Sequence, residues 1–158
     1  MIIEIDTREH KSEYERIVSQ FDALGVKYIR TKIWVGDYRS LDNPLTVIDR
    51  KQSLLELCSN ITQQHERFRN ELIRANEAGI HLIILCEHSS EIKSLEDVYF
   101  WENPRSKKSP KATSGRTLFR ILNTIRAKYG VQFEFCDKFH TGQRIVELLR
   151  NEVNDERN

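Results

Sequence analysis

The chain has 158 residues, about the size of one ordinary domain, and its 39% hydrophobic and 31% charged residues indicate a folded globular protein rather than a disordered one. The formal net charge is only +1, so the overall charge gives no reason to expect nucleic-acid binding. No apolar run approaches the ~18 residues of a membrane helix, and the N-terminal sequence Met-Ile-Ile-Glu-Ile-Asp does not resemble a signal peptide.

In the first part of the chain, segments with strand periodicity and helix periodicity alternate and are separated by turn residues. The run Asp42-Asn43-Pro44 has the composition of a turn between two strands, which predicts an antiparallel hairpin. The expected elements are, in chain order, a strand at Ile2–Asp6, a helix from Ser12 to Gly25, strands at Val26–Val35 and Asp37–Leu41, and a hairpin of Tyr38–Leu41 with Leu45–Arg50.

The second part of the chain continues this alternation. Ile80–Cys86 is almost entirely apolar, which predicts a strand that is buried on both faces of a sheet. The other expected elements are helices at Ser53–Ala78, Ser114–Tyr129 and Thr141–Val153, and a strand at Val131–Cys136. We therefore expect residues 1–153 to form one α/β domain with a mixed sheet covered by helices, followed by a frayed polar tail at residues 154–158.

Positive charge is concentrated late in the chain, although the net charge is small. No acidic residue occurs between Asn103 and Phe133. We call Asn103–Arg116 the basic segment, because it carries Arg105, Lys107, Lys108, Lys111 and Arg116. A solvated loop has the same composition, so the charges indicate DNA binding only beside a site that handles phosphate. Pro104 and Pro110 predict that this segment is not helical, and we expect it to contact DNA phosphates.

Charged residues stand at the ends of the predicted hairpin strands. Because side chains alternate along a strand, Asp49 and Lys51 are expected to point the same way and Arg50 the opposite way. Strand pairing can bring Asp37 close to Asp49, and two close carboxylates favour a cation such as Mg²⁺ or Mn²⁺. Lys51 would orient or deprotonate a water molecule, or stabilise charge on a phosphate. Metal-dependent nucleases use this constellation, but an exposed hairpin with surface charges has the same spacing.

The first strand also ends on acids and a base, in the order Asp6, Arg8 and Glu9. The segments "IEIDTRE", "VGDY" and "VIDRK", in this order and at these separations, resemble the nuclease domain of the XPF family of structure-specific DNA endonucleases. That family has Asp-x-Arg-Glu, Gly-Asp-Tyr and Glu-Arg-Lys at these places. "HERFRNELIRA" is similar to the family's Gly-Arg-Phe/Tyr-x-x-Gln helix. The resemblance covers nearly the whole chain and implies a restriction-endonuclease-like α/β core, with a mixed central sheet flanked by helices.

The resemblance also implies roles for individual residues. The implied metal ligands are Asp6, Asp37 and Asp49, Glu9 is an acid close to the metal site, and Lys51 is the catalytic lysine. Arg8, Arg50 and Arg67 match basic positions that we expect to contact DNA. Three positions depart from the family pattern. Asp49 stands where Glu is usual, Leu55 replaces a frequent Asp, and Gln64-His65-Glu66 replaces a glycine turn.

The function implied by the resemblance is Mg²⁺-dependent (or Mn²⁺-dependent) cleavage of branched DNA, such as flaps, forks or junctions, in DNA repair or recombination. No small-molecule cofactor and no membrane partner are expected. Two alternatives remain open at this point. The chain could be a non-catalytic DNA-binding subunit of a nuclease, or a restriction-type endonuclease that acts on linear duplex. The presence of Asp37 and Asp49 together with Lys51 argues against a pure binding module, because a protein that only binds DNA has no reason to cluster acidic residues beside phosphate.

The sequence predicts a homodimer. In the family a tandem helix-hairpin-helix domain usually follows the nuclease domain and aids pairing, and this chain ends soon after its last predicted helix. Apolar residues on the last two predicted helices exceed what one small domain easily buries, and core packing is the alternative for them. These residues are Leu118, Ile121, Leu122, Ile125, Ile145, Val146, Leu148 and Leu149.

The chain has three cysteines, which is an odd number, and they are widely spaced. Both features are typical of reduced thiols in a cytosolic protein. With no targeting signal, we expect a cytoplasmic, nucleoid-associated protein if the host is prokaryotic or viral. Cys86 with His88, and Cys136 with His140, could form a zinc site between neighbouring strands. The paired Cys-x-x-Cys spacing of such sites is absent, so buried thiols are favoured.

Overall fold

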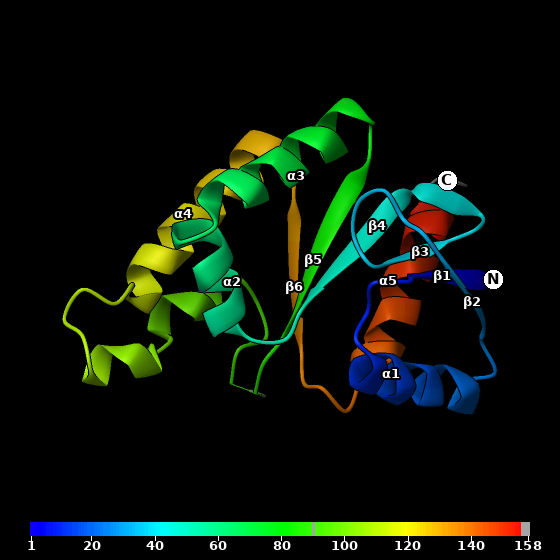
Figure 1. Cartoon of the computed structure of the whole chain (residues 1–158), viewed down its shortest axis with the longest axis horizontal. Helices are drawn as coiled ribbons and strands as arrows, with labels where there is room; N and C mark the ends of the chain where they lie inside the picture. Colours follow the sequence, from blue (N-terminus) through cyan, green and yellow to red (C-terminus); the bar gives the residue numbers. More distant parts are fainter. Residues whose placement is uncertain (90, 156–158) are drawn as a thin grey trace.

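The computed structural model describes residues 1–89 and 91–155, which form a mixed six-stranded sheet with helices on both faces (Figure 1). The elements are β1 (Ile2–Asp6), α1 (Lys11–Ala23), β2 (Lys27–Thr31), β3 (Tyr38–Ser40), β4 (Asn43–Lys51), α2 (Leu54–Thr62), α3 (His65–Glu77), β5 (His81–Glu87), η1 (Glu96–Phe100), η2 (Pro104–Lys107), α4 (Gly115–Tyr129), β6 (Gln132–Cys136) and α5 (Thr141–Asp155). The predicted α/β class with a mixed, helix-flanked sheet is confirmed.

The strand order is β2-β1-β3-β4-β5-β6. β1 pairs antiparallel with β3, and β3 pairs antiparallel with β4, so β1 and β4 run in the same direction. β4, β5 and β6 are mutually parallel. The carboxyl ends of β1 and β4 therefore lie at one edge of the sheet, together with the start of β3. This topology is what gathers the motif residues, which are far apart in the sequence.

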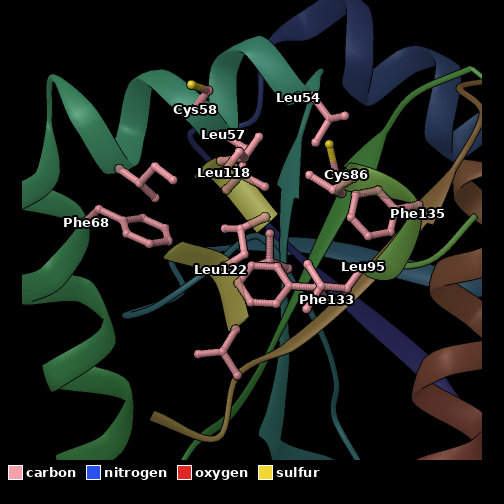
Figure 2. Packing of buried hydrophobic residues seen from close by; sticks show 14 of the residues in the cluster. Leu54, Leu57, Cys58, Phe68, Cys86, Leu95, Leu118, Leu122, Phe133 and Phe135 are labelled. Carbon is pink, nitrogen blue, oxygen red and sulfur yellow. The ribbon is translucent and has the colours of Figure 1, made fainter. Parts of the chain in front are cut away.

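Two hydrophobic cores fill the two sides of the sheet. In Figure 1, α2, α3 and α4 lie on one face, and α1 and α5 lie on the other. The first core is shown in Figure 2, where Leu118, Leu122 and Phe133 pack beneath α2, and Phe68 reaches toward them from α3 at the side. β5 serves both cores, because Ile84 belongs to the first and Ile83 to the second. The near-continuous apolar run of β5 thus reflects burial on both faces, as predicted.

The expected single helix at Ser53–Ala78 is instead two helices. α2 ends at Thr62, α3 begins at His65, and Gln64 between them has a non-helical backbone (φ −116°, ψ 31°). The sequence contains only polar residues between the core residues Ile61 and Phe68, so apolar periodicity gave no indication of the break. Because of the break, α3 has a different axis from α2, and its polar residues Arg67, Glu71 and Arg74 lie at the edge of the sheet where β1 and β4 end.

The expected strand at Val26–Val35 is also shorter, because β2 ends at Thr31. Beyond it, the backbone N–H of Ile33 donates to Asp6 Oδ1 at 2.9 Å instead of to a neighbouring strand. A buried carboxylate thus competes successfully with sheet pairing for this segment. Residues 32–37 consequently form a loop that leads into β3.

The basic segment differs from its prediction at two points. Pro104–Lys107 forms the short 3₁₀ helix η2, with Pro at its start, where proline's missing N–H costs nothing. Arg116 lies in the first turn of α4, whose N-cap Ser114 accepts a hydrogen bond from the N–H of Thr117 at 3.1 Å. The buried side chain of Asn103 bridges the segment, donating to the Thr113 carbonyl at 2.9 Å.

The apolar residues that suggested a dimer are accounted for within the chain. Leu118 and Leu122 of α4 are fully buried, and Ile121 and Ile125 pack against the same core. The apolar residues Ile145–Leu149 of α5 are buried in the second core. That argument for a homodimer was wrong, because core packing explains these side chains; the homodimer itself stays a prediction. Asn154 and Asp155 belong to α5, and residues 156–158 of the expected tail lie outside the described residues.

None of the helices in the described part of the chain is both long enough and apolar enough to cross a membrane.

Candidate active site

A cavity of about 440 Å³ opens where the ends of β1 and β4 meet the N-terminal end of β3. α2 and α3 contribute its other walls. Its lining includes every residue that the three sequence motifs and the "HERF" helix single out, namely Asp6, Arg8, Glu9, Asp37, Asp49, Arg50, Lys51 and Arg67. The charged residues of the basic segment lie elsewhere, and two of them, Arg105 and Lys111, line a second cavity of about 390 Å³.

Asp37 and Asp49 come together across the hairpin, as strand pairing predicted. The N–H of Asp37 donates to the Ile48 carbonyl at 2.8 Å, and the N–H of Arg50 donates to Asp37 Oδ2 at 2.8 Å. Gly36 makes this approach possible, since its φ is +77° and a Cβ would lie 2.4 Å from Val47 Cγ1. Burial and the neighbouring Asp49 carboxylate raise the pKa of Asp37 well above its usual value.

Lys51 lies beside this pair on the same face of β4. Its Nζ is 3.1 Å from Asp49 Oδ2. Burial alone would lower the pKa of Lys51, but the carboxylates of Asp49 and Glu71 outweigh it, and the pKa is raised. The ammonium group therefore stays charged at neutral pH. Asp49 Oδ2 is buried. Its contact with Lys51 has the distance of an ion pair but not the geometry of a hydrogen bond, and Asp49 Oδ2 has no other hydrogen-bond partner among the described residues.

Glu71 of α3 is a site residue that the sequence reasoning missed. It lines the same cavity, and burial together with the Asp49 carboxylate raises its pKa to about 7, although Lys51 opposes the shift. Two signals in the sequence pointed to it. Arg67, Glu71 and Arg74 follow helical spacing and share one face of α3. Glu71 also stands where the family motif quoted above has Gln.

Asp6 occupies the expected place but has other partners. It is fully buried, and its Oδ1 accepts the N–H of Ile33 at 2.9 Å. Its Oδ2 accepts from the Arg8 guanidinium Nε at 2.6 Å. Burial would raise the pKa of Asp6, but the hydrogen bonds from Arg8 and Ile33 prevail and lower it. Asp6 therefore holds the β2–β3 loop in place, and the structure gives no support for its predicted role as a metal ligand.

Glu9 and Arg50 belong to a buried charge network. Arg50 Nη2 donates to Glu9 Oε1 at 2.9 Å, and its Nη1 is paired with Glu87 Oε1. The hydroxyl of Tyr38 donates to Glu9 Oε2 at 2.7 Å. Because the Arg50 side chain is only 6% exposed, it is not placed to bind DNA as predicted. Alternation along β4 did predict correctly that Arg50 points away from Asp49 and Lys51.

Glu87 is the second residue that the sequence missed. It also binds Arg16 of α1, with Nη2 to Oε2 at 2.8 Å, and it accepts from the Thr141 hydroxyl of α5 at 3.0 Å. Glu87 follows an apolar strand just as Asp49 does, so its position was visible in the sequence, but its partners were not. The network joins the loop after β1, together with β3, β4 and β5, to the two helices on the second face of the sheet.

The zinc alternative finds no support. Cys86 belongs to the first core and Cys136 packs against the second, so the two thiols face opposite sides of the sheet. Burial raises the pKa of Cys136 to about 11, and it raises that of Cys86 further. In residues 1–89 and 91–155, no three His, Cys, Asp or Glu side chains are grouped so as to hold a metal ion.

A magnesium ion is compatible with the site in spite of this. Mg²⁺ keeps several water molecules and commonly takes only one or two carboxylates, with substrate phosphates completing its shell. Asp37 and Asp49 provide such a pair of hard oxygen ligands. The raised pKa of Asp37, caused by burial and by the neighbouring Asp49 carboxylate, is what two carboxylates show where a cation would relieve their repulsion.

Known structures share this fold. A structure of XPF from Aeropyrum pernix is similar to this chain with a TM-score of 0.69 and 21% sequence identity, over 99% of this chain and 69% of that chain. A complex of XPF from Aeropyrum pernix with DNA is similar with a TM-score of 0.67 and 20% identity, over 98% of this chain and 66% of that chain. At this identity, the likeness establishes the fold.

The family itself follows from the sequence. No curated protein matched the chain. The model of the ERCC4 domain, by contrast, matches residues 5–149, which include the charged residues of all three motifs and the residues that line the cavity. The chain therefore belongs to the ERCC4 domain family.

Proposed function

We propose that this protein is a Mg²⁺-dependent endonuclease that hydrolyses phosphodiesters of branched DNA. The observation that carries the proposal is the crowded pair Asp37 and Asp49 with the charged Lys51 beside it, in a cavity whose rim carries exposed arginines. Membership of the ERCC4 domain family supports it, as does the similarity to an XPF that was solved with DNA.

Asp37 and Asp49 would hold the metal ion in this proposal. When bound, Mg²⁺ polarises the phosphate and lowers the pKa of a water molecule. Lys51 acts as a positive charge, because its raised pKa keeps it protonated, and it stabilises the charge that develops on the phosphate. Arg67 and Arg8 are exposed at the rim, where they bind neighbouring phosphates of the DNA.

The basic segment supplies a second DNA contact. α2 stands between the two cavities, with Glu56 and Asn60 in the wall of the first and Ser59 and Thr62 in the wall of the second. Lys107, Lys108 and Lys111 are exposed at the second cavity or next to it. DNA that enters the first cavity and crosses α2 would meet these lysines, which bind phosphates regardless of base sequence.

One assay separates the candidate functions. Labelled flap, fork, four-way junction and linear duplex are each incubated with the protein in Mg²⁺, Mn²⁺ or EDTA. We expect cleavage of at least one branched substrate near its branch point, no cleavage in EDTA, and much slower cleavage of linear duplex. Equal cleavage of linear duplex would favour the restriction-type alternative. Tight binding of DNA without cleavage in either metal would favour a non-catalytic subunit.

A further inference from the structure

Trp34 is the most exposed tryptophan of the chain and stands between two buried residues. It is 70% exposed, whereas Ile33 and Val35 on either side are 1% and 2% exposed. Exposure of an aromatic side chain does not by itself indicate a function, because Phe100 and Phe139 are 79% and 72% exposed. What distinguishes Trp34 is the way its loop is anchored and its place in the wall of the candidate active site.

The backbone holds the indole outward. The N–H of Ile33 is fixed by Asp6 Oδ1, and its carbonyl accepts from Arg8 Nη2 at 2.9 Å. Val35 is packed in the first core. Because the residues on both sides are anchored, Trp34 cannot turn inward without breaking these contacts. Its exposure is built into the loop.

The indole lies at the candidate active site. Trp34 lines the same cavity as Asp37, which is three residues further along the chain. The guanidinium carbon of Arg74 on α3 lies 5.8 Å from the ring centroid, and Arg74 is exposed as well. An aromatic face beside an arginine is the combination that binds single-stranded nucleic acid, with the ring stacking on a base and the guanidinium binding a phosphate.

We propose that Trp34 stacks on an unpaired DNA base next to the bond that is cut, and so selects branch points over continuous duplex. The proposal rests on the function proposed above and adds the element that recognises the substrate. In linear duplex the bases are stacked on each other and paired, so that none offers a free face. At a flap or fork at least one base next to the junction is unpaired, and only there can the indole gain a stacking partner.

Binding is tested by fluorescence, in EDTA so that no cleavage occurs. The chain has two tryptophans, so a Trp101→Phe variant leaves Trp34 as the single tryptophan, whose fluorescence is excited selectively at wavelengths that the tyrosines do not absorb. Oligo-deoxythymidine and a flap are expected to quench it, and linear duplex is not. Because Trp101 is partly buried against the first core, the difference between the wild type and Trp34→Phe provides the same signal if Trp101→Phe fails to fold. Absence of quenching by oligo-deoxythymidine would overturn the proposal.

Selectivity is tested by substitution. Trp34→Ala is expected to lower affinity for oligo-deoxythymidine and the preference for flap over linear duplex by about tenfold each, as for loss of one base stack. Trp34→Phe should retain most of both, and Mn²⁺ affinity should be unchanged in either variant. Phe139→Ala is the matched control, since Phe139 is 72% exposed with Lys138 Nζ 5.4 Å from its ring centroid, and it should change nothing.

The outcomes separate this proposal from the function on which it rests. An equal loss of flap and linear-duplex cleavage in Trp34→Ala would overturn the stacking role while leaving the nuclease intact. A wild type that cleaves no DNA, yet is quenched by oligo-deoxythymidine, would refute the nuclease and retain the stacking role.

Discussion

The two faces of β4 at its carboxyl end hold buried charges in opposite conditions. On one face, Arg50 is bound by two carboxylates whose remaining oxygens are also engaged, so the charges there are balanced and hydrogen-bonded. On the other face, Asp37 and Asp49 crowd together, and one oxygen of Asp49 has no hydrogen-bond partner in the described part of the chain. Consecutive residues of one strand thus serve different purposes.

This difference teaches how to recognise a reactive site among many buried charges. A buried ion pair with complete hydrogen bonding orders its surroundings and resists change. Two carboxylates that lie close together without enough neighbouring positive charge repel each other and destabilise the folded protein. Natural proteins retain such pairs mainly where a bound ligand offsets the repulsion. The contrast leads to opposite expectations for mutations on the two faces.

The largest effect is expected for Asp37→Asn. Removing one carboxylate of the pair should lower the cleavage rate by about three orders of magnitude, because the metal ion loses a charged ligand. The amide can still accept the N–H of Arg50, so the fold should persist, with a higher melting temperature in EDTA at pH 8 as repulsion is relieved. Rates come from single-turnover cleavage and stability from calorimetry. Near wild-type cleavage in Mg²⁺ would refute the metal assignment, and Asp49→Asn should behave alike.

On the other face, Arg50→Met should do the reverse. It removes the cation from between Glu9 and Glu87 and leaves the buried carboxylate of Glu9 without a cationic partner, whereas Glu87 retains Arg16, at a cost of roughly 3 to 5 kcal/mol in the free energy of unfolding. Urea denaturation followed by circular dichroism measures this change. Arg39→Met, at a partly exposed ion pair with Glu4, is the control and should cost far less. Equal costs for the two variants would contradict the distinction between the faces.

Lys51→Ala should reduce the cleavage rate by about a hundredfold, which is typical for removing one group that stabilises transition-state charge. Mn²⁺ binding should persist, since the ammonium group competes with the metal for Asp49 rather than assisting it. Isothermal titration calorimetry with Mn²⁺ tests this division of roles. Lys51→Arg retains the charge and should recover part of the rate. Loss of metal affinity together with activity in Lys51→Ala would disprove the assignment.

Acid should stabilise the metal-free protein. The pKa of Glu71 rises on folding from 4.5 to about 7, so between these values the folded state binds more protons than the unfolded state, and stability falls as the pH rises. The raised pKa of Asp37 acts in the same direction. In EDTA, the melting temperature should therefore be higher at pH 5 than at pH 8, by a few degrees. Glu71→Gln should reduce this difference in melting temperature. Mg²⁺ should raise the melting temperature more at pH 8 than at pH 5, since protons compete with the metal ion for the carboxylates. A pH-independent melting temperature would show that the carboxylates are not crowded.

The smallest effect is expected far from β4. Replacing Lys107, Lys108 and Lys111 by Ala should weaken binding to every DNA shape alike. The slope of log K against log salt concentration should become shallower by about one unit for each phosphate that is no longer neutralised. Metal affinity and the cleaved position should stay the same. Lys27→Ala, on the edge strand β2, provides the surface control. If the triple variant binds a flap as tightly as the wild type with the same slope, the basic segment does not bind DNA.

The sequence predicted those features that depend on neighbours along the chain. Strand alternation was enough to place Asp49 and Lys51 on one face and Arg50 on the other, and turn residues located the hairpin that brings Asp37 to Asp49. What it could not predict depends on contacts between distant segments. Asp6 captures the N–H of Ile33, which shortens β2, and Glu87 meets Arg16 and Thr141 through the packing of α1 and α5. No local pattern encodes such partners.

The bonds of Asp6 change how a loss-of-function mutation there should be interpreted. An Asp6→Ala protein that no longer cuts DNA would look like one that has lost a metal ligand. Yet Asp6 is the anchor of the loop that carries both Trp34 and the approach to Asp37, so the same result would follow from a displaced loop alone. Loss of cleavage in an Asp6 variant therefore does not distinguish a lost metal ligand from a displaced loop unless the position of the loop is checked separately.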